Sequence, residues 1–156
     1  MIPPNPLEHQ NAVKMLYSKC VGRVCQKHEI TRMELDILLF LANNPCFDTA
    51  SDIVEMRYLS KSQVSASVKS LEMRGYIRKE YAEDNRKTVH LTICDAASAL
   101  VADGKDAQEK FLMVMMEGIP KEELECMRRC MCRMLENIDQ YIKSDYGSKE
   151  GGKKNV

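Results

Sequence analysis

The sequence of 156 residues has no net charge and no long run of apolar residues. Its 23 lysines and arginines balance its 23 aspartates and glutamates, so a case for a polyanionic partner has to rest on a local excess of charge. No segment approaches the roughly 18–20 apolar residues that span a bilayer, and the mean hydropathy is −0.38. We therefore expect no membrane partner. The length fits one ordinary domain, or a small domain with helices added for pairing.

The sequence also lacks the short motifs of common enzymes and of secreted proteins. There is no H-E-x-x-H, no G-x-S-x-G and no glycine-rich phosphate loop, and His9, His28 and His90 are scattered. We expect no catalytic residues and no cofactor. The first six residues have neither a basic region nor an apolar run, so the seven cysteines are predicted to be reduced thiols in the cytoplasm.

Helical periodicity begins near the N-terminus. Apolar residues at helical spacing predict a first helix over residues 7–26, with a stripe formed by Val13, Leu16, Cys20, Val21 and Val24. Thr31 and Glu34 match a capping box that opens a second helix, and the proline after Asn43 and Asn44 ends it.

Two further caps organise the middle of the chain. Asp48 and Thr49 are placed to cap a short third helix. Ser60 and Gln63 form a second box, opening a helix that is buried through Val64, Val68 and Leu71 and is closed by Gly75 in a left-handed conformation. The period then changes to about two, which predicts a β-hairpin over residues 76–92 with a charged tip at residues 83–86.

The remainder is predicted to be helical. A helix over residues 96–117 is broken at residues 118–120, and a last helix follows. Its three-four spacing of apolar residues gives a seam for a partner helix, formed by Leu124, Met127, Met131, Met134, Leu135, Ile138, Tyr141 and Ile142. The tail at 147–156, rich in glycine and lysine, is predicted to be disordered.

The order of a helix, a short helix, a capped helix and a basic hairpin predicts a mostly α fold with a small β-hairpin wing, that is, a winged helix-turn-helix. In such a unit the second helix of the pair crosses a DNA major groove, and the hairpin lies beside it as a wing. The face of the capped helix opposite the predicted core carries short polar side chains, which suit base edges. The predicted DNA-binding residues are Ser60, Lys61, Ser62, Gln63, Ser65, Ala66, Lys69, Arg78, Arg86 and Lys87.

The local charge supports this interpretation. Between residues 60 and 90 the chain carries seven cations, Lys61, Lys69, Arg74, Arg78, Lys79, Arg86 and Lys87. It carries four anions there, Glu72, Glu80, Glu83 and Asp84, so the local balance is +3. Phosphate neutralisation supplies most of the sequence-independent affinity for DNA, and Arg86 at the wing tip is placed to enter a minor groove.

The chain resembles the MarR family of bacterial regulators over nearly all of its length. The residues that carry the resemblance are 49–54, the capped-helix segment 59–65, the exit Leu71-Glu72-Met73-Arg74-Gly75-Tyr76-Ile77, the wing residues Asp84-Asn85-Arg86-Lys87 and the strand 89–92. The sequence departs from the family pattern at residues 93–96, which replace a charged residue and a glycine. This departure leaves the start of the following helix open.

The resemblance implies a division of labour along the chain. Residues 1–30 and 96–146 would form a helical dimerisation region, and residues 31–95 a winged helix-turn-helix DNA-binding domain. Asp84 would stabilise the wing by pairing with arginine, while Arg86 touches DNA. The implied activity is that of a homodimeric repressor on pseudo-palindromic operators, released by a small apolar or phenolic effector that binds between the dimer body and the winged domain.

Two alternatives remain open at this point. Some members of the family sense oxidants through a cysteine of the first helix, and Cys20 and Cys25 lie there, so a thiol-based redox regulator is the first alternative. The second is a winged-helix protein-interaction module that does not bind DNA. Cys126 and Cys130 lie one helical turn apart, but cysteine on an interface helix is more often packing than a ligand, so no metal site is predicted.

Overall fold

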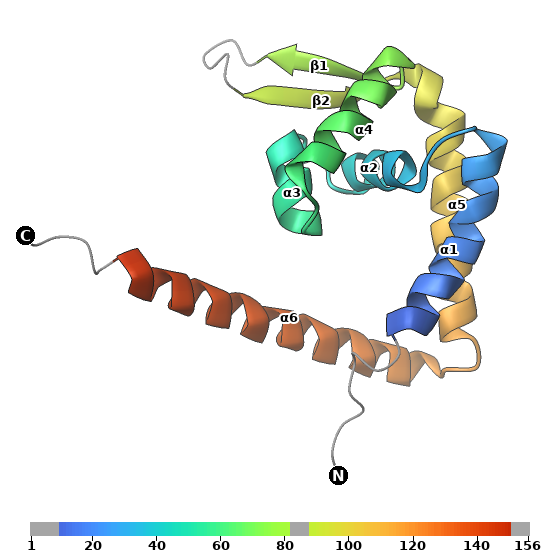
Figure 1. Cartoon of the computed structure of the whole chain (residues 1–156). Coiled ribbons are helices and arrows are strands. Elements are labelled where there is room, and N and C mark those ends of the chain that lie inside the picture. Colours follow the sequence, from blue (N-terminus) through green and yellow to red (C-terminus); the bar gives the residue numbers. More distant parts are fainter. Residues whose placement is uncertain (1–9, 82–87, 151–156) are drawn as a thin grey trace, which may run out of the picture. The chain divides into compact units, whose positions relative to one another are not determined.

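The computed structural model describes residues 10–81 and 88–150, which fold into helices and one β-hairpin (Figure 1). In chain order the elements are α1 (Gln10–Lys27), α2 (Arg32–Asn43), α3 (Ala50–Arg57), α4 (Lys61–Met73), β1 (Ile77–Tyr81), β2 (Val89–Ile93), the 3₁₀ turn η1 (Asp95–Ala97), α5 (Ser98–Met116) and α6 (Lys121–Glu150). The predicted fold class, mostly α with a small β-hairpin wing, is confirmed.

The chain forms two compact units, one ending at Val114 and one beginning at Met115. In the first unit, helices α1 to α5 and the hairpin share one apolar core. Its fully buried side chains include Val21, Leu35, Ile37, Leu38, Leu39, Ile53, Val64, Leu71, Ile77 and Leu100. Because α1 and most of α5 contribute to this core, they are bound to the winged segment 31–95 within one chain. Their assignment to a dimerisation region concerns a second chain and stays a prediction.

The predicted helix caps are present. Thr31 caps α2 and Thr49 caps α3, each with both hydrogen bonds of a capping box, to Glu34 and Asp52 respectively. These bonds satisfy amide groups that the first turn of a helix leaves free. Tyr58 ends α3 in the left-handed conformation, with φ of 52°, and this sharp turn separates α3 from α4 by only three residues.

The two ends of α4 are closed in different ways. At its start the Ser60 hydroxyl accepts from the backbone amide of Gln63 (3.3 Å), which is the first bond of the predicted capping box. The Gln63 side-chain oxygen accepts from the Ser60 hydroxyl (2.8 Å) and not, as in a full box, from the Ser60 backbone amide. At its end Gly75, with φ of +72°, donates to the Glu72 carbonyl, and the Tyr76 amide donates to the Leu71 carbonyl. These two bonds form the Schellman motif that a left-handed glycine permits, as predicted for Gly75.

The hairpin pairs β1 with β2 antiparallel, with Ile77 opposite Ile93 and Tyr81 opposite Val89. Its base is fixed to the loop before α3, since the Leu91 amide donates to the Asp48 carbonyl (2.7 Å) and His90 Nδ1 lies 2.7 Å from a carboxylate oxygen of Asp48. The hairpin therefore has a defined position beside α4.

The C-terminal helices differ from the prediction at two boundaries. A 3₁₀ turn occupies residues 95–97, so α5 begins at Ser98 and not at residue 96. Helix α6 continues to Glu150, past residue 147 where the predicted disordered tail begins, and the disorder of the tail stays a prediction. Local helical continuity outweighs the single glycine at 147. Within the described ranges, no helix is both long and apolar enough to cross a bilayer.

Candidate nucleic-acid interface

Helix α4 has one buried and one exposed face. Val64, Val68 and Leu71 are at most 4% exposed, as predicted, and fix the rotation of the helix about its axis. All the residues predicted to read DNA from this helix are exposed: Ser60, Lys61, Ser62, Gln63, Ser65, Ala66 and Lys69. The face of α4 opposite the core is therefore exposed from the N-cap to Lys69, and most of its side chains are polar.

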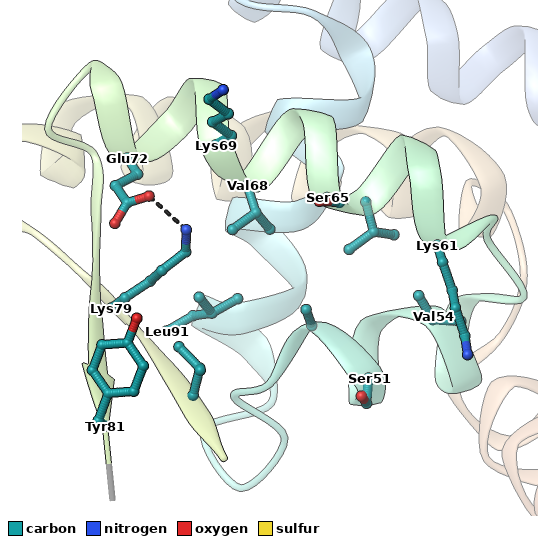
Figure 2. A pocket seen from close by; sticks show the side chains of 13 residues that line it. Ser51, Val54, Lys61, Ser65, Val68, Lys69, Glu72, Lys79, Tyr81 and Leu91 are labelled. Carbon is teal, nitrogen blue, oxygen red and sulfur yellow. Dashed lines mark hydrogen bonds and ion pairs between the residues drawn. The ribbon is translucent and has the colours of Figure 1, made fainter. Parts of the chain in front are cut away.

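A groove of about 610 Å³ lies between α3, α4 and the hairpin (Figure 2). The side chains of Lys61, Ser65 and Lys69 line its α4 wall, at spacings that place them on one stripe of the helix. Lys79 and Tyr81 line it from β1. The groove therefore lies between α4 and the hairpin and is lined by lysines from both.

The cations of β1 and of the end of α4 already have partners. Arg78 pairs with Glu80 at 2.6 Å, and Lys79 pairs with Glu72 at 2.6 Å. Arg74 donates to the backbone carbonyls of residues 28 and 29, at 2.9 and 2.8 Å. Both members of each ion pair were counted, so the local balance stays at +3, but these three cations are engaged within the chain. Among the predicted DNA-binding residues that the structure describes, Arg78 is the one paired with a carboxylate.

Three predicted site residues, Asp84, Arg86 and Lys87, lie at the hairpin tip, outside the described residues. Their predicted roles in stabilising the wing and contacting DNA stay predictions.

A buried carboxylate holds α4 in place. Glu34, on α2, is 5% exposed and accepts hydrogen bonds from the Ser70 hydroxyl (2.5 Å) and the Thr31 amide (2.7 Å). Burial works to raise the pKa of Glu34, but the bonds from Ser70 and Thr31 outweigh it, and the pKa is lowered. The sequence predicted Glu34 only as part of a helix cap. Its contact with α4 was missed, because its partner Ser70 is 36 residues away in the chain.

This carboxylate makes stability depend on pH. A lowered pKa in the folded state means that the contribution of Glu34 is complete above its unfolded pKa and is lost as pH falls through the folded pKa. We expect Glu34→Gln to lower the free energy of unfolding by about 1–3 kcal/mol at pH 7, and the deficit to shrink below about pH 4. Urea unfolding at several pH values measures the loss at pH 7 and its decrease at low pH. Glu109→Gln, at an exposed position of α5, is the control, and an equal deficit at pH 7 and pH 3 would contradict the assignment.

A second cavity, of about 750 Å³, lies in the first unit between α1, α2, α5 and the end of α3. Its aromatic wall is formed by Tyr17 and Phe111, whose rings meet edge to face at 5.2 Å. The Arg32 guanidinium lies 4.2 Å from the centre of the Tyr17 ring. Lys14 and Arg57 also line the cavity. The sequence did not reveal this site, because its members come from four helices and no short motif joins them.

The candidate redox thiols lie in α1. Cys20 and Cys25 are both half-buried and pack against the core. Burial raises the pKa of the Cys25 thiol. A peroxide-sensing cysteine is favoured by the opposite direction, because the thiolate is the reactive form. Cys126 and Cys130 are exposed on α6.

A short helix, a tight turn, a second helix with an exposed polar face and a hairpin beside it define the winged helix-turn-helix class. Residues 28–87 match the family model described as MarR family. PecS, an HTH-type transcriptional regulator of Dickeya dadantii (strain 3937), is 26% identical over 91 residues, which is 57% of this chain and 55% of PecS. Over residues 28–87 the chain is therefore similar to the MarR family.

Solved structures agree with this fold. A MarR family regulator from Listeria monocytogenes, complexed with 26mer DNA, has a TM-score of 0.75 at 16% identity, over 99% of each chain. A MarR transcriptional regulator from Methanosarcina mazei Go1 has a TM-score of 0.68 at 15% identity, over 84% of this chain and 96% of its own. The predicted fold is thus confirmed, the predicted family is the one whose model matches residues 28–87, and the alignment with PecS spans about half of that protein.

Proposed function

We propose that this chain is a transcriptional regulator that binds double-stranded DNA through the exposed face of α4. The single observation that carries the proposal is that face: Ser62, Gln63, Ser65, Ala66 and Lys69 are all exposed, while Val64 and Val68 are turned into the core. The DNA-bound relative from Listeria monocytogenes and the regulator PecS support it.

The residue types on this face suit duplex DNA. The Gln63 carboxamide has the donor and acceptor pair that matches adenine, and the Ser65 hydroxyl can serve as donor or acceptor. Ala66 is small enough to meet a thymine methyl group, while Lys69 reaches guanine or phosphate. The amides of the first turn, next to Ser60, favour a phosphate. The helix therefore combines groups that recognise bases with groups that hold the backbone.

The chain works as a homodimer in this proposal. Helix α6 exposes large apolar side chains along its described part, on one stripe: Met127, Met131, Met134, Leu135, Ile138, Tyr141 and Ile142. A helix with such a seam buries it against a partner. A two-fold dimer would present two α4 helices to successive major grooves, about 34–36 Å apart. The proposed target is a pseudo-palindromic operator in the cytoplasm, at which the dimer represses transcription.

Selection of bound duplexes from a random pool tests this function. Recovered sequences should contain two inverted half-sites whose centres are about 10 base pairs apart. A pool that shows no enrichment over several rounds, at low salt, would contradict DNA recognition. Enrichment of a single half-site would retain DNA binding but contradict the two-fold arrangement.

The effector is proposed to occupy the cavity beside Tyr17. An aromatic ring fits between the apolar side chains of Val13, Phe111 and Leu112, and Lys14, Arg32 and Arg57 give the lining a positive charge. Arg32 is held by Asp36 at 2.9 Å. Arg57 is the last residue of α3, immediately before the turn into α4. A small aromatic carboxylate bound there would act on the spacing of the two α4 helices through its differential affinity for the two states.

Benzoate and its neutral analogue benzamide probe this cavity. We expect benzoate to bind at least about tenfold more tightly than benzamide, because an ion pair that is partly desolvated contributes about 1.4 kcal/mol or more. Arg57→Met should remove the preference for the anion, whereas Arg23→Met, on the exposed side of α1, should keep it. Calorimetry measures the affinities. Equal affinity for both probes in the parent protein would contradict an anionic effector.

A further inference from the structure

Glu72 is the one acidic residue within α4, and its position is unfavourable for the helix itself. It lies in the last turn, where the carbonyl groups of the helix end disfavour a negative charge. It also lines the groove on the same wall as Lys61, Ser65 and Lys69. An anion is thus present on the surface that the proposed function turns toward a polyanion. Helix stability does not account for it.

The partner of Glu72 is a cation of the wing. Figure 2 shows Lys79 reaching from β1 to the end of α4, where its Nζ atom lies 2.6 Å from Oε2 of Glu72. The two side chains are 31% and 38% exposed. Ion pairs at this level of exposure contribute little to folding, typically below about 1 kcal/mol. Folding therefore gains little from the contact, and it cancels the charge of a lysine that lines the groove.

We propose that Glu72 limits the affinity of this protein for DNA of any sequence by holding Lys79 in an electroneutral pair inside the DNA interface. The inference rests on the proposed DNA-binding function. A lysine that neutralises a phosphate releases a condensed counterion, and each such contact steepens the dependence of log K on log salt by about 0.9. Lys79 paired with Glu72 makes no such contribution.

The consequence is weaker binding to DNA in general. Sequence-independent affinity comes almost wholly from phosphate contacts, whereas discrimination comes from base edges. An anion that cancels one phosphate contact therefore weakens binding to all sequences by the same factor and leaves the ratio between specific and non-specific binding unchanged. Glu72 thus sets how tightly the protein is held on any DNA, while the side chains of Gln63 and Ser65 set which sequence it prefers.

The test is a salt series on a random-sequence duplex, from about 0.05 to 0.2 M salt, followed by fluorescence anisotropy. Glu72→Gln should steepen the slope by about 0.9 and tighten binding about eightfold at 0.1 M salt, because one phosphate contact changes the affinity by that factor between 1 M salt, where variant and parent bind alike, and 0.1 M. Adding Lys79→Gln to this variant should reverse both changes. Glu109→Gln, which removes the same charge from α5, is the control and should keep the slope of the parent. Thermal unfolding checks that every variant is folded.

Three outcomes are distinguishable. A Glu72→Gln variant with the slope of the parent overturns the inference, since Glu72 then has no part in the interface. A gain that persists after Lys79→Gln also overturns it, because Glu72 would act by direct repulsion and not through Lys79. If the parent and every variant fail to bind the duplex even at the lowest salt, the proposed DNA-binding function fails, and this inference with it.

Discussion

An Ala66→Glu substitution is expected to abolish DNA binding, with a loss of affinity of more than about a hundredfold, or about 2.7 kcal/mol. Ala66 is exposed near the middle of the polar face of α4. A carboxylate at this position would lie against the DNA phosphates, and the repulsion between like charges in an interface costs several kcal/mol of binding free energy. Alanine and glutamate are both good helix formers, so the fold should be unaffected.

Ala102→Glu provides the matched control, because Ala102 is an exposed alanine of α5. Anisotropy with a duplex recovered from the random pool measures both affinities, and circular dichroism compares the folds. The control should bind within about twofold of the parent, as expected for an exposed substitution outside the interface. An Ala66→Glu protein that is folded and binds as tightly as the control would remove α4 from the interface.

The second large effect is expected in α6. Introducing glutamate at Met131 and Ile138 together should dissociate the proposed dimer, because burying two unpaired charges in an apolar seam costs several kcal/mol. Light scattering should give a mass near twice 17.8 kDa for the parent and near 17.8 kDa for the variant. The variant should also lose binding to a paired site, since each half-site would then be bound separately.

Glutamate at Arg133 and Gln140 is the control for this experiment. These two positions have the same separation of seven residues but lie on the opposite side of α6, away from the apolar stripe. The control should remain a dimer. A parent protein with the mass of one chain at all concentrations would contradict the assigned seam, as would dissociation of both double variants alike.

Local signals in the sequence were sufficient to predict the winged helix-turn-helix. Thr31, Thr49, Ser60 and Gly75 mark helix ends through bonds to residues at most five positions away, so their effect is contained in a short window of sequence. The burial of Val64 and Val68 followed from helical period alone. For this reason the exposed face of α4 was predicted residue by residue.

Contacts between residues far apart in the chain could not be predicted from short windows of sequence. Ser70 reaches Glu34 across 36 positions, and Tyr17 accepts from Gln108 across 91. The Lys79–Glu72 pair needs the Schellman turn and the hairpin register together before the two side chains can meet. Charge counting along the sequence therefore gave the net balance of residues 60–90, but it did not show that Arg78 and Lys79 of β1 are each paired with a carboxylate.

Acylation of lysines in the presence and absence of a selected duplex tests the central claim most directly. Lys61 and Lys69 are exposed on the groove side of α4, and Lys105 is exposed on α5. Mass spectrometry of the modified protein should find that DNA protects Lys61 and Lys69 while Lys105 keeps its reactivity. Equal acylation of Lys61 and Lys69 with and without bound DNA would contradict the assignment of α4 as the DNA-reading helix.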